Sequence, residues 1–147
     1  MIKWRRLTFF SFDFVIVILL LLSCKHEMRP IEYGKDNCEQ CRMTVMNPQF
    51  GAGMLTSKGK VFAFDAGECL VRYLRSKGFE EKEEYFVSDY SAPGTLINAR
   101  TAIFLHGDSI QSPMGGNLAA FSSIESAKLV QYELGGRIMK WNDLFKK

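Results

Sequence analysis

Residues 51–74 read GAGMLTSKGKVFAFDAGECLVRYL, and this stretch decides the fold of the chain. It begins with a β-prone apolar run up to Thr56, continues through the turn formers Ser57-Lys58-Gly59, and returns in the apolar run Lys60–Phe64. Two β-prone runs joined by a short glycine-containing loop predict a β-hairpin. A helix and a further strand follow this hairpin, and the second half of the sequence repeats the same order of elements.

A helix is expected directly after this hairpin. Asp65 followed three residues later by Glu68 is the signature of a capping box, which marks a helix start. The cationic and glycine pair Lys77-Gly78 predicts its end. Because Tyr85-Phe86-Val87 reads as the next strand, this part of the chain runs strand, strand, helix, strand.

The second half of the sequence repeats that order. Thr101–Leu105 and Asn117–Phe121 are predicted strands, and Ser122–Glu125 offers a second capping box. Gly135-Gly136 predicts the end of the helix, and Arg137–Trp141 the last strand. The sequence therefore predicts an α+β fold of two small ββαβ lobes, at residues 38–90 and 91–147.

The N-terminus has the features of an export signal. Residues 1–23 combine a basic start with a short apolar run, and Ser23-Cys24 follows directly. Leu21-Leu22-Ser23-Cys24 resembles a bacterial lipobox, which predicts lipidation of Cys24, whereas an uncleaved anchor helix and an ordinary secretory signal are the alternatives. Residues 24–37 are then expected to form a flexible tether. We expect a lipid-anchored protein of the cell envelope that faces the periplasm.

Composition narrows the classes of function. The 147 residues are enough for one domain, and the formal charge of +3 becomes nearly neutral once the basic leader is removed. A nearly neutral chain lacks the polycationic footprint of a nucleic-acid-binding protein. No Ser-His-Asp arrangement or paired-carboxylate site is evident from the spacing, so we do not expect an enzyme.

The motif Cys38-Glu39-Gln40-Cys41-Arg42-Met43 is the sharpest local feature. A CxxC pair serves redox exchange, zinc binding or a structural disulfide, and an exported chain admits all three. Met43 adds a soft, uncharged thioether, and thiolates with thioethers are the ligands that suit Cu(I). Histidine is scarce, which disfavours a site that needs several imidazoles.

A second sulfur stands in the turn-forming stretch Ser112-Pro113-Met114-Gly115-Gly116. Most methionines are core filler, but a methionine among turn formers has little reason to be in a core. Met114 is therefore a candidate metal ligand. Cys69, on the predicted helix, is expected to be a small buried hydrophobic residue, and His106 an exposed or hydrogen-bonded histidine rather than a ligand.

These motifs together resemble the NosL family. The resemblance rests on the CxxCxM motif of residues 38–43, the helix entry FDAGECL at 64–70, the loop SPMGGNLAAF at 112–121 and the Gly-Gly-Arg of 135–137. Arg42 departs from the glycine usual in the family. The family consists of membrane-anchored copper chaperones that help to mature nitrous oxide reductase.

The resemblance implies two ββαβ lobes and Cu(I) held by sulfur. Carried over by motif, Cys41, Met43 and Met114 would be its ligands, and Cys38 is a further candidate thiolate or a disulfide partner of Cys41. The implied partner is nitrous oxide reductase or its membrane copper-delivery complex. An exported thiol–disulfide exchange protein that uses Cys38 and Cys41, and a structural lipoprotein with a plain disulfide, are the alternatives.

Overall fold

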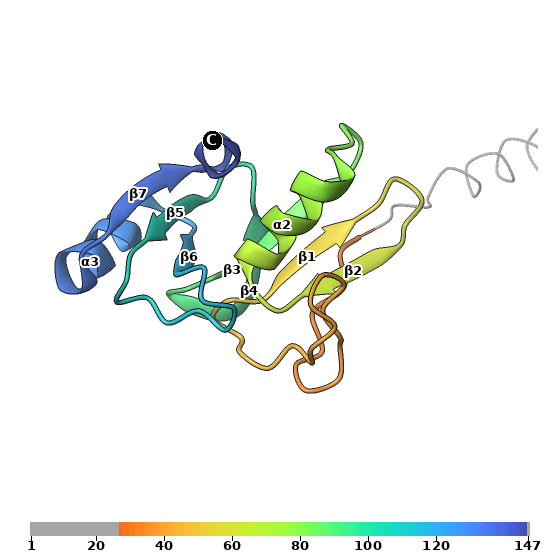
Figure 1. Ribbon diagram of the computed structural model, residues 1–147, viewed down its shortest axis with the longest axis horizontal. Helices are drawn as coiled ribbons and strands as arrows, with labels where there is room; N and C mark the ends of the chain where they lie inside the picture. The colour runs from red at the N-terminus through yellow and green to blue at the C-terminus, as the bar shows by residue number, and fades with distance from the viewer. Residues whose placement is uncertain (1–26, 147) are drawn as a thin grey trace, which may run out of the picture.

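The computed structural model describes residues 27–146 (Figure 1). The predicted signal peptide and Cys24 therefore lie outside the described residues. Across the described part of the chain, no helix has the length and apolar character needed to cross a bilayer.

The first sheet contains four antiparallel strands in the order β2-β1-β3-β4. The predicted hairpin is confirmed as β1 (Ala52–Leu55) and β2 (Val61–Phe64), and α2 (Gly67–Lys77) follows it. The helix ends as predicted at Gly78, whose φ of 88° is a conformation open to glycine. β3 (Glu84–Asp89) then pairs with the free edge of β1.

The second sheet repeats this arrangement with three strands in the order β6-β5-β7. It contains β5 (Ile103–His106), β6 (Leu118–Phe121) and β7 (Arg137–Lys140), with α3 (Ile124–Leu134) between the last two. In both sheets the first strand along the chain lies in the centre and the helix joins the second strand to the third (Figure 1). The predicted α+β class is confirmed. A 3-10 helix, η1 (Trp141–Phe145), closes the chain.

One strand was not expected. β4 (Ala92–Asn98) pairs with β3 and extends the first sheet beyond residue 90. Its Pro93 and Gly94 read as turn formers, but β4 is the edge strand of the sheet, where a missing N–H and a glycine are tolerated.

The predicted helix starts need correction. α2 begins after Ala66 with no side-chain cap, so Asp65 and Glu68 do not form the expected capping box. α3 is capped by Ser123 rather than Ser122, and the Ser123 hydroxyl accepts a hydrogen bond from the Ser126 N–H. Glu68 is used elsewhere, because its carboxylate holds a loop of the second lobe.

The last part of the expected tether packs against the core. Ile31 is only 6% exposed and belongs to the main hydrophobic cluster. Tyr33 is hydrogen-bonded through its hydroxyl to Ser88 Oγ at 3.0 Å, and Arg29 forms an ion pair with Asp36 at 2.8 Å. The segment from residue 29 to 36 is therefore part of the folded domain, because it buries an aliphatic side chain that a free tether would expose.

The larger of two hydrophobic clusters spans both lobes. The main cluster contains buried residues of both sheets. Trp141 of η1 stacks on Tyr85 of β3, with ring centroids 5.7 Å apart, and also contacts Phe104 of β5 at 6.2 Å. Burial of aromatic surface across the junction therefore stabilises the arrangement of the two sheets.

Phe104→Ala should lower the free energy of unfolding by about 3–5 kcal/mol, because it leaves a cavity where the lobes meet. The control is Leu129→Ala on α3, since Leu129 is 71% exposed and its removal should cost less than about 0.5 kcal/mol. Urea denaturation measures both. Equal losses in the two variants would contradict a shared core.

Candidate metal centre

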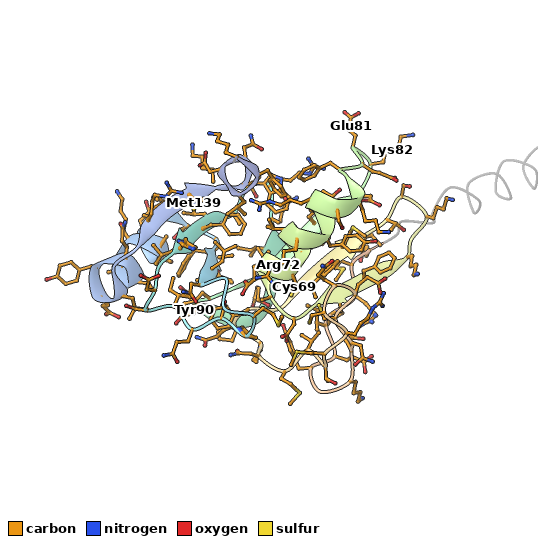
Figure 2. The ribbon with its side chains drawn as sticks, viewed as in Figure 1. Cys69, Arg72, Glu81, Lys82, Tyr90 and Met139 are labelled. Atoms are coloured by element: carbon orange, nitrogen blue, oxygen red, sulfur yellow. The ribbon has the colours of Figure 1, made fainter. Side chains whose placement is uncertain are left out.

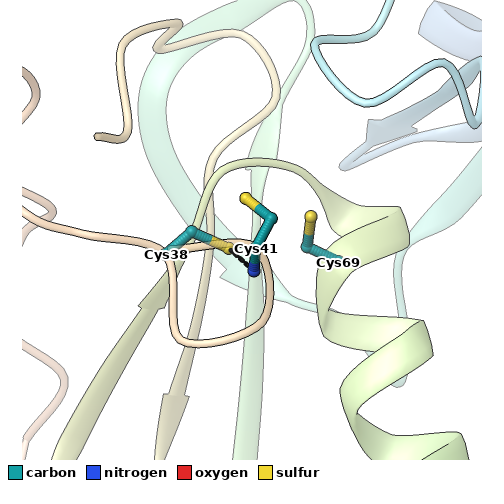
Figure 3. A group of neighbouring side chains, drawn as sticks. All are labelled: Cys38, Cys41 and Cys69. Atoms are coloured by element: carbon teal, nitrogen blue, oxygen red, sulfur yellow. Dashed lines mark hydrogen bonds between the residues drawn. The ribbon is translucent and has the colours of Figure 1, made fainter. Parts of the chain in front are cut away.

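Three cysteine side chains meet at one place. The Sγ atoms of Cys38, Cys41 and Cys69 all lie within 4.8 Å of one another. Cys38 and Cys41 come from the turn that precedes β1, and Cys69 comes from the first turn of α2 (Figure 3). All three are free thiols. The grouping is a compact soft-donor site.

The turn that carries Cys38 and Cys41 is closed by backbone hydrogen bonds. The Cys38 N–H donates to the Met43 carbonyl at 2.8 Å, and the Arg42 N–H donates to the Cys38 carbonyl at 2.9 Å. Arg42 has a φ of 67°, a left-handed conformation that glycine adopts freely. A β-bridge between Cys38 and Ala63 of β2 fixes the turn on the sheet.

Cys69 is the residue that the sequence interpretation missed. The expectation that it is buried is correct, since it is 0% exposed, but its sulfur belongs to the cluster instead of serving only as packing. The local sequence predicts only that Cys69 lies on the buried face of a helix. Its partnership depends on the bridge between residues 38 and 63, which no local pattern reveals.

The cluster holds one low-pKa thiol. The Cys69 thiol, together with the backbone N–H groups of Cys41 and Asp65, hydrogen-bonds Cys38 and lowers the pKa of Cys38 to about 5. The Cys41 N–H lies 3.4 Å from Cys38 Sγ. The same interaction with Cys38 raises the pKa of Cys69, and burial raises the pKa of Cys41. Cys38 is therefore the thiolate of the metal-free cluster, held by preorganised donors.

The two candidate methionines lie in different surroundings. Met43 is 57% exposed, so its thioether is open to solvent. Met114 is half-buried and packs against the main hydrophobic cluster, which includes Cys38 and Cys69. The backbone carbonyl of Met114 accepts a hydrogen bond from Arg72 on α2 at 3.5 Å. The Met114 loop therefore borders the helix that carries Cys69.

Glu68 ties the Met114 loop to that helix. Its Oε1 accepts hydrogen bonds from the Ser112 hydroxyl and, at 3.1 Å, from the Gly116 N–H. Gly116 must be small, because a Cβ there would lie 2.6 Å from Glu68 Cγ. Since Glu68 immediately precedes Cys69, the clamp fixes the loop against the first turn of the helix that carries Cys69.

His106 lies away from the cysteines. It ends β5, is exposed, and lines a cleft between the two lobes. Of the residues from 27 to 146, the three cysteines form the one group of three or more cysteine, histidine or acidic side chains close enough to share a metal ion. An imidazole ligand is therefore not part of this cluster.

These features define a small α+β protein with a three-cysteine candidate metal centre between a CxxC turn and a helix start, and a methionine loop held against the same helix. A model of the NosL family matches residues 31–147. The chain belongs to the NosL family.

The chain is similar to two NosL proteins in sequence or fold. It is 25% identical over 129 residues to the copper-binding lipoprotein NosL of Stutzerimonas stutzeri, covering 82% of this chain and 68% of that protein. The fold is similar to the crystal structure of the copper chaperone NosL from Shewanella denitrificans, with a TM-score of 0.71 and 24% identity. That match covers 81% of this chain and 96% of the other.

Glu68→Ala should free the Met114 loop, because it leaves the Ser112 hydroxyl and the Gly116 N–H without their acceptor. We expect hydrogen exchange at the Gly116 amide to accelerate at least about tenfold, which corresponds to a loss of about 1–3 kcal/mol. Glu68→Gln retains an acceptor oxygen and should keep most of the protection. Unchanged exchange in the alanine variant would contradict the clamp.

The metal-free protein should contain a thiolate at pH 7. Because the pKa of Cys38 is lowered, its thiolate takes up a proton only as the pH falls through about 5, and the thiolate absorbance near 240 nm should disappear there. Cys69→Ala removes the main donor and should move this midpoint upward. Cys41→Ala keeps the backbone N–H and should move it less. Absence of thiolate absorbance at pH 7 would refute this assignment.

Proposed function

We propose that this protein carries copper as Cu(I) in the bacterial cell envelope and delivers it for the assembly of nitrous oxide reductase. The observation that carries the proposal is the cluster of three thiols in a chain of the NosL family. Cys41, Met43, Met114 and Cys38 remain the proposed ligands, and the geometry adds Cys69 to them.

The donor set favours Cu(I) over zinc. Thiolates and thioethers are soft donors that suit a monovalent copper ion. A structural zinc site takes four ligands, usually cysteines and histidines. The cluster supplies three thiols, and His106 is not among its members. A low-coordinate Cu(I) ion needs no fourth ligand from the chain.

The proposed ligands differ in their exposure to solvent. Cys38 and Cys69 are 0% exposed, Cys41 is partly exposed, and Met43 is open to solvent. A ligand from a recipient protein can therefore approach from the side of Cys41 and Met43 while the buried thiols still hold the ion. Such stepwise exchange combines tight retention with release to a partner.

The same burial argues against thiol–disulfide exchange. The attacking group in that reaction is an accessible thiolate. Here the low-pKa thiol, Cys38, is buried, whereas burial raises the pKa of the accessible Cys41. The cluster therefore suits a bound ion better than attack on an external disulfide.

The proposed function includes anchoring of the protein at a membrane and delivery of copper to a recipient. One relative is named a copper-binding lipoprotein and another a copper chaperone, which supports the same roles here. Lipidation at Cys24 would hold the protein at a membrane, facing the periplasm, and raise its effective concentration near a membrane copper-delivery complex. Nitrous oxide reductase, or that complex, is the proposed recipient.

Anaerobic titration with Cu(I) against a competing chromophoric chelator tests copper binding. We expect one Cu(I) per chain, with affinity lowered by about 100-fold or more in Cys41→Ala and Cys69→Ala and by about tenfold in Met43→Ala and Met114→Ala. Met46→Ala is the matched control, because Met46 is 66% exposed on the same segment as Met43 and should bind copper like the unaltered protein. Retention of full affinity in Cys41→Ala would refute the site.

A further inference from the structure

A cleft of about 320 Å³ lies between α2 and the β7–η1 segment. Arg72 and Met139, which line it, come from these two elements (Figure 2). Its floor includes the buried aliphatic residues Val71, Leu118 and Leu144. Four cationic side chains surround this floor: Arg72, Arg75, Arg137 and Lys146.

The positive charge of the cleft is only partly neutralised. Lys146 pairs with Asp143 at 2.7 Å, and Arg75 donates to the Leu144 carbonyl at 2.6 Å. Among residues 27–146, Arg72, Arg75 and Arg137 form no salt bridge. Glu68 is the other carboxylate in the lining, and its Oε1 is already used by the Met114 loop. Guanidinium groups without a carboxylate partner, gathered in a cleft, attract an anionic group.

The cleft borders the loop that carries Met114. Arg72 lies one helical turn after Cys69 and donates to the Met114 carbonyl. Gly116 of the same loop lines the cleft. A molecule in the cleft therefore touches the loop that carries Met114, which is one of the proposed copper ligands.

We propose that this cleft is the docking site for an acidic peptide segment of the protein that receives the metal, an inference that rests on the proposed function. An aliphatic floor with a cationic rim matches a segment that has apolar side chains flanked by carboxylates. An inorganic anion would use the rim alone. Bidentate contacts from arginines to the carboxylates would orient the segment, and its charge would accelerate association.

The test uses the copper-free protein and the synthetic peptide Glu-Leu-Glu-Glu-Leu-Glu, with binding followed by amide chemical shifts at low and at physiological salt. Shifts should centre on α2 and β7, and affinity should fall with salt. Arg137→Glu should weaken binding at least about fivefold. Lys128→Glu is the control, because it makes the same charge change at an exposed position of α3 and should bind normally.

Three further ligands, tested in the same way, show whether the cleft binds an acidic peptide or a small anion. A peptide with glutamine in place of glutamate should not bind, and free glutarate and phosphate should bind much more weakly than the acidic peptide. Equal binding of glutarate would overturn the docking proposal in favour of a small-anion site. Equal peptide binding by Arg137→Glu would overturn the cleft as the site. Copper affinity of Arg137→Glu should be unchanged, so failure of docking is distinguishable from failure of copper binding.

Discussion

The pairing of Cys38 with Ala63 is the constraint on which the candidate metal centre depends. The two residues form a parallel β-bridge, and the Glu39 N–H donates to the Ala63 carbonyl at 2.9 Å. β2 ends one residue later and leads directly into α2. Once the CxxC turn is fixed at this end of β2, Cys69 has to lie beside it. The cluster is therefore a consequence of strand pairing, and two of its three thiols are buried as part of the core.

A second constraint joins the lobes at the same point. The sequence predicts that Glu68 closes a capping box at the start of α2, but Ala66 is the N-cap, so Glu68 is only the second residue of the helix and α2 has no side-chain cap. Its carboxylate holds Ser112 and Gly116 of the other lobe instead. A carboxylate that makes a long-range contact where the local sequence predicts a helix cap is the kind of departure from local rules found at functional sites. In this protein the contact places a methionine loop next to the helix that carries Cys69.

The sequence predicts well whatever is determined locally. The hairpin, the glycine helix ends and the repeated ββαβ order follow from turn formers and apolar periodicity. β4 was not predicted, and its Pro93 and Gly94 are acceptable in a strand only because β4 lies at the edge of the sheet. Cys69 was misjudged because its sulfur partners are some thirty residues away and meet it only through the Cys38–Ala63 bridge. The ligand roles of Met43 and Met114, inferred from motif and resemblance, stay predictions.

Arg42 adopts a backbone conformation in the CxxC turn that glycine would adopt without strain. Its φ of 67° lies in the region where glycine is free and other residues are strained by roughly 1–2 kcal/mol. The Arg42 side chain pairs with Glu39 at 3.0 Å, but an exposed pair offsets only part of that strain. The remainder is outweighed by the burial of Cys38 and by the hydrogen bonds that close the turn. The turn therefore depends on a left-handed backbone conformation between Cys41 and Met43, which Arg42 adopts here.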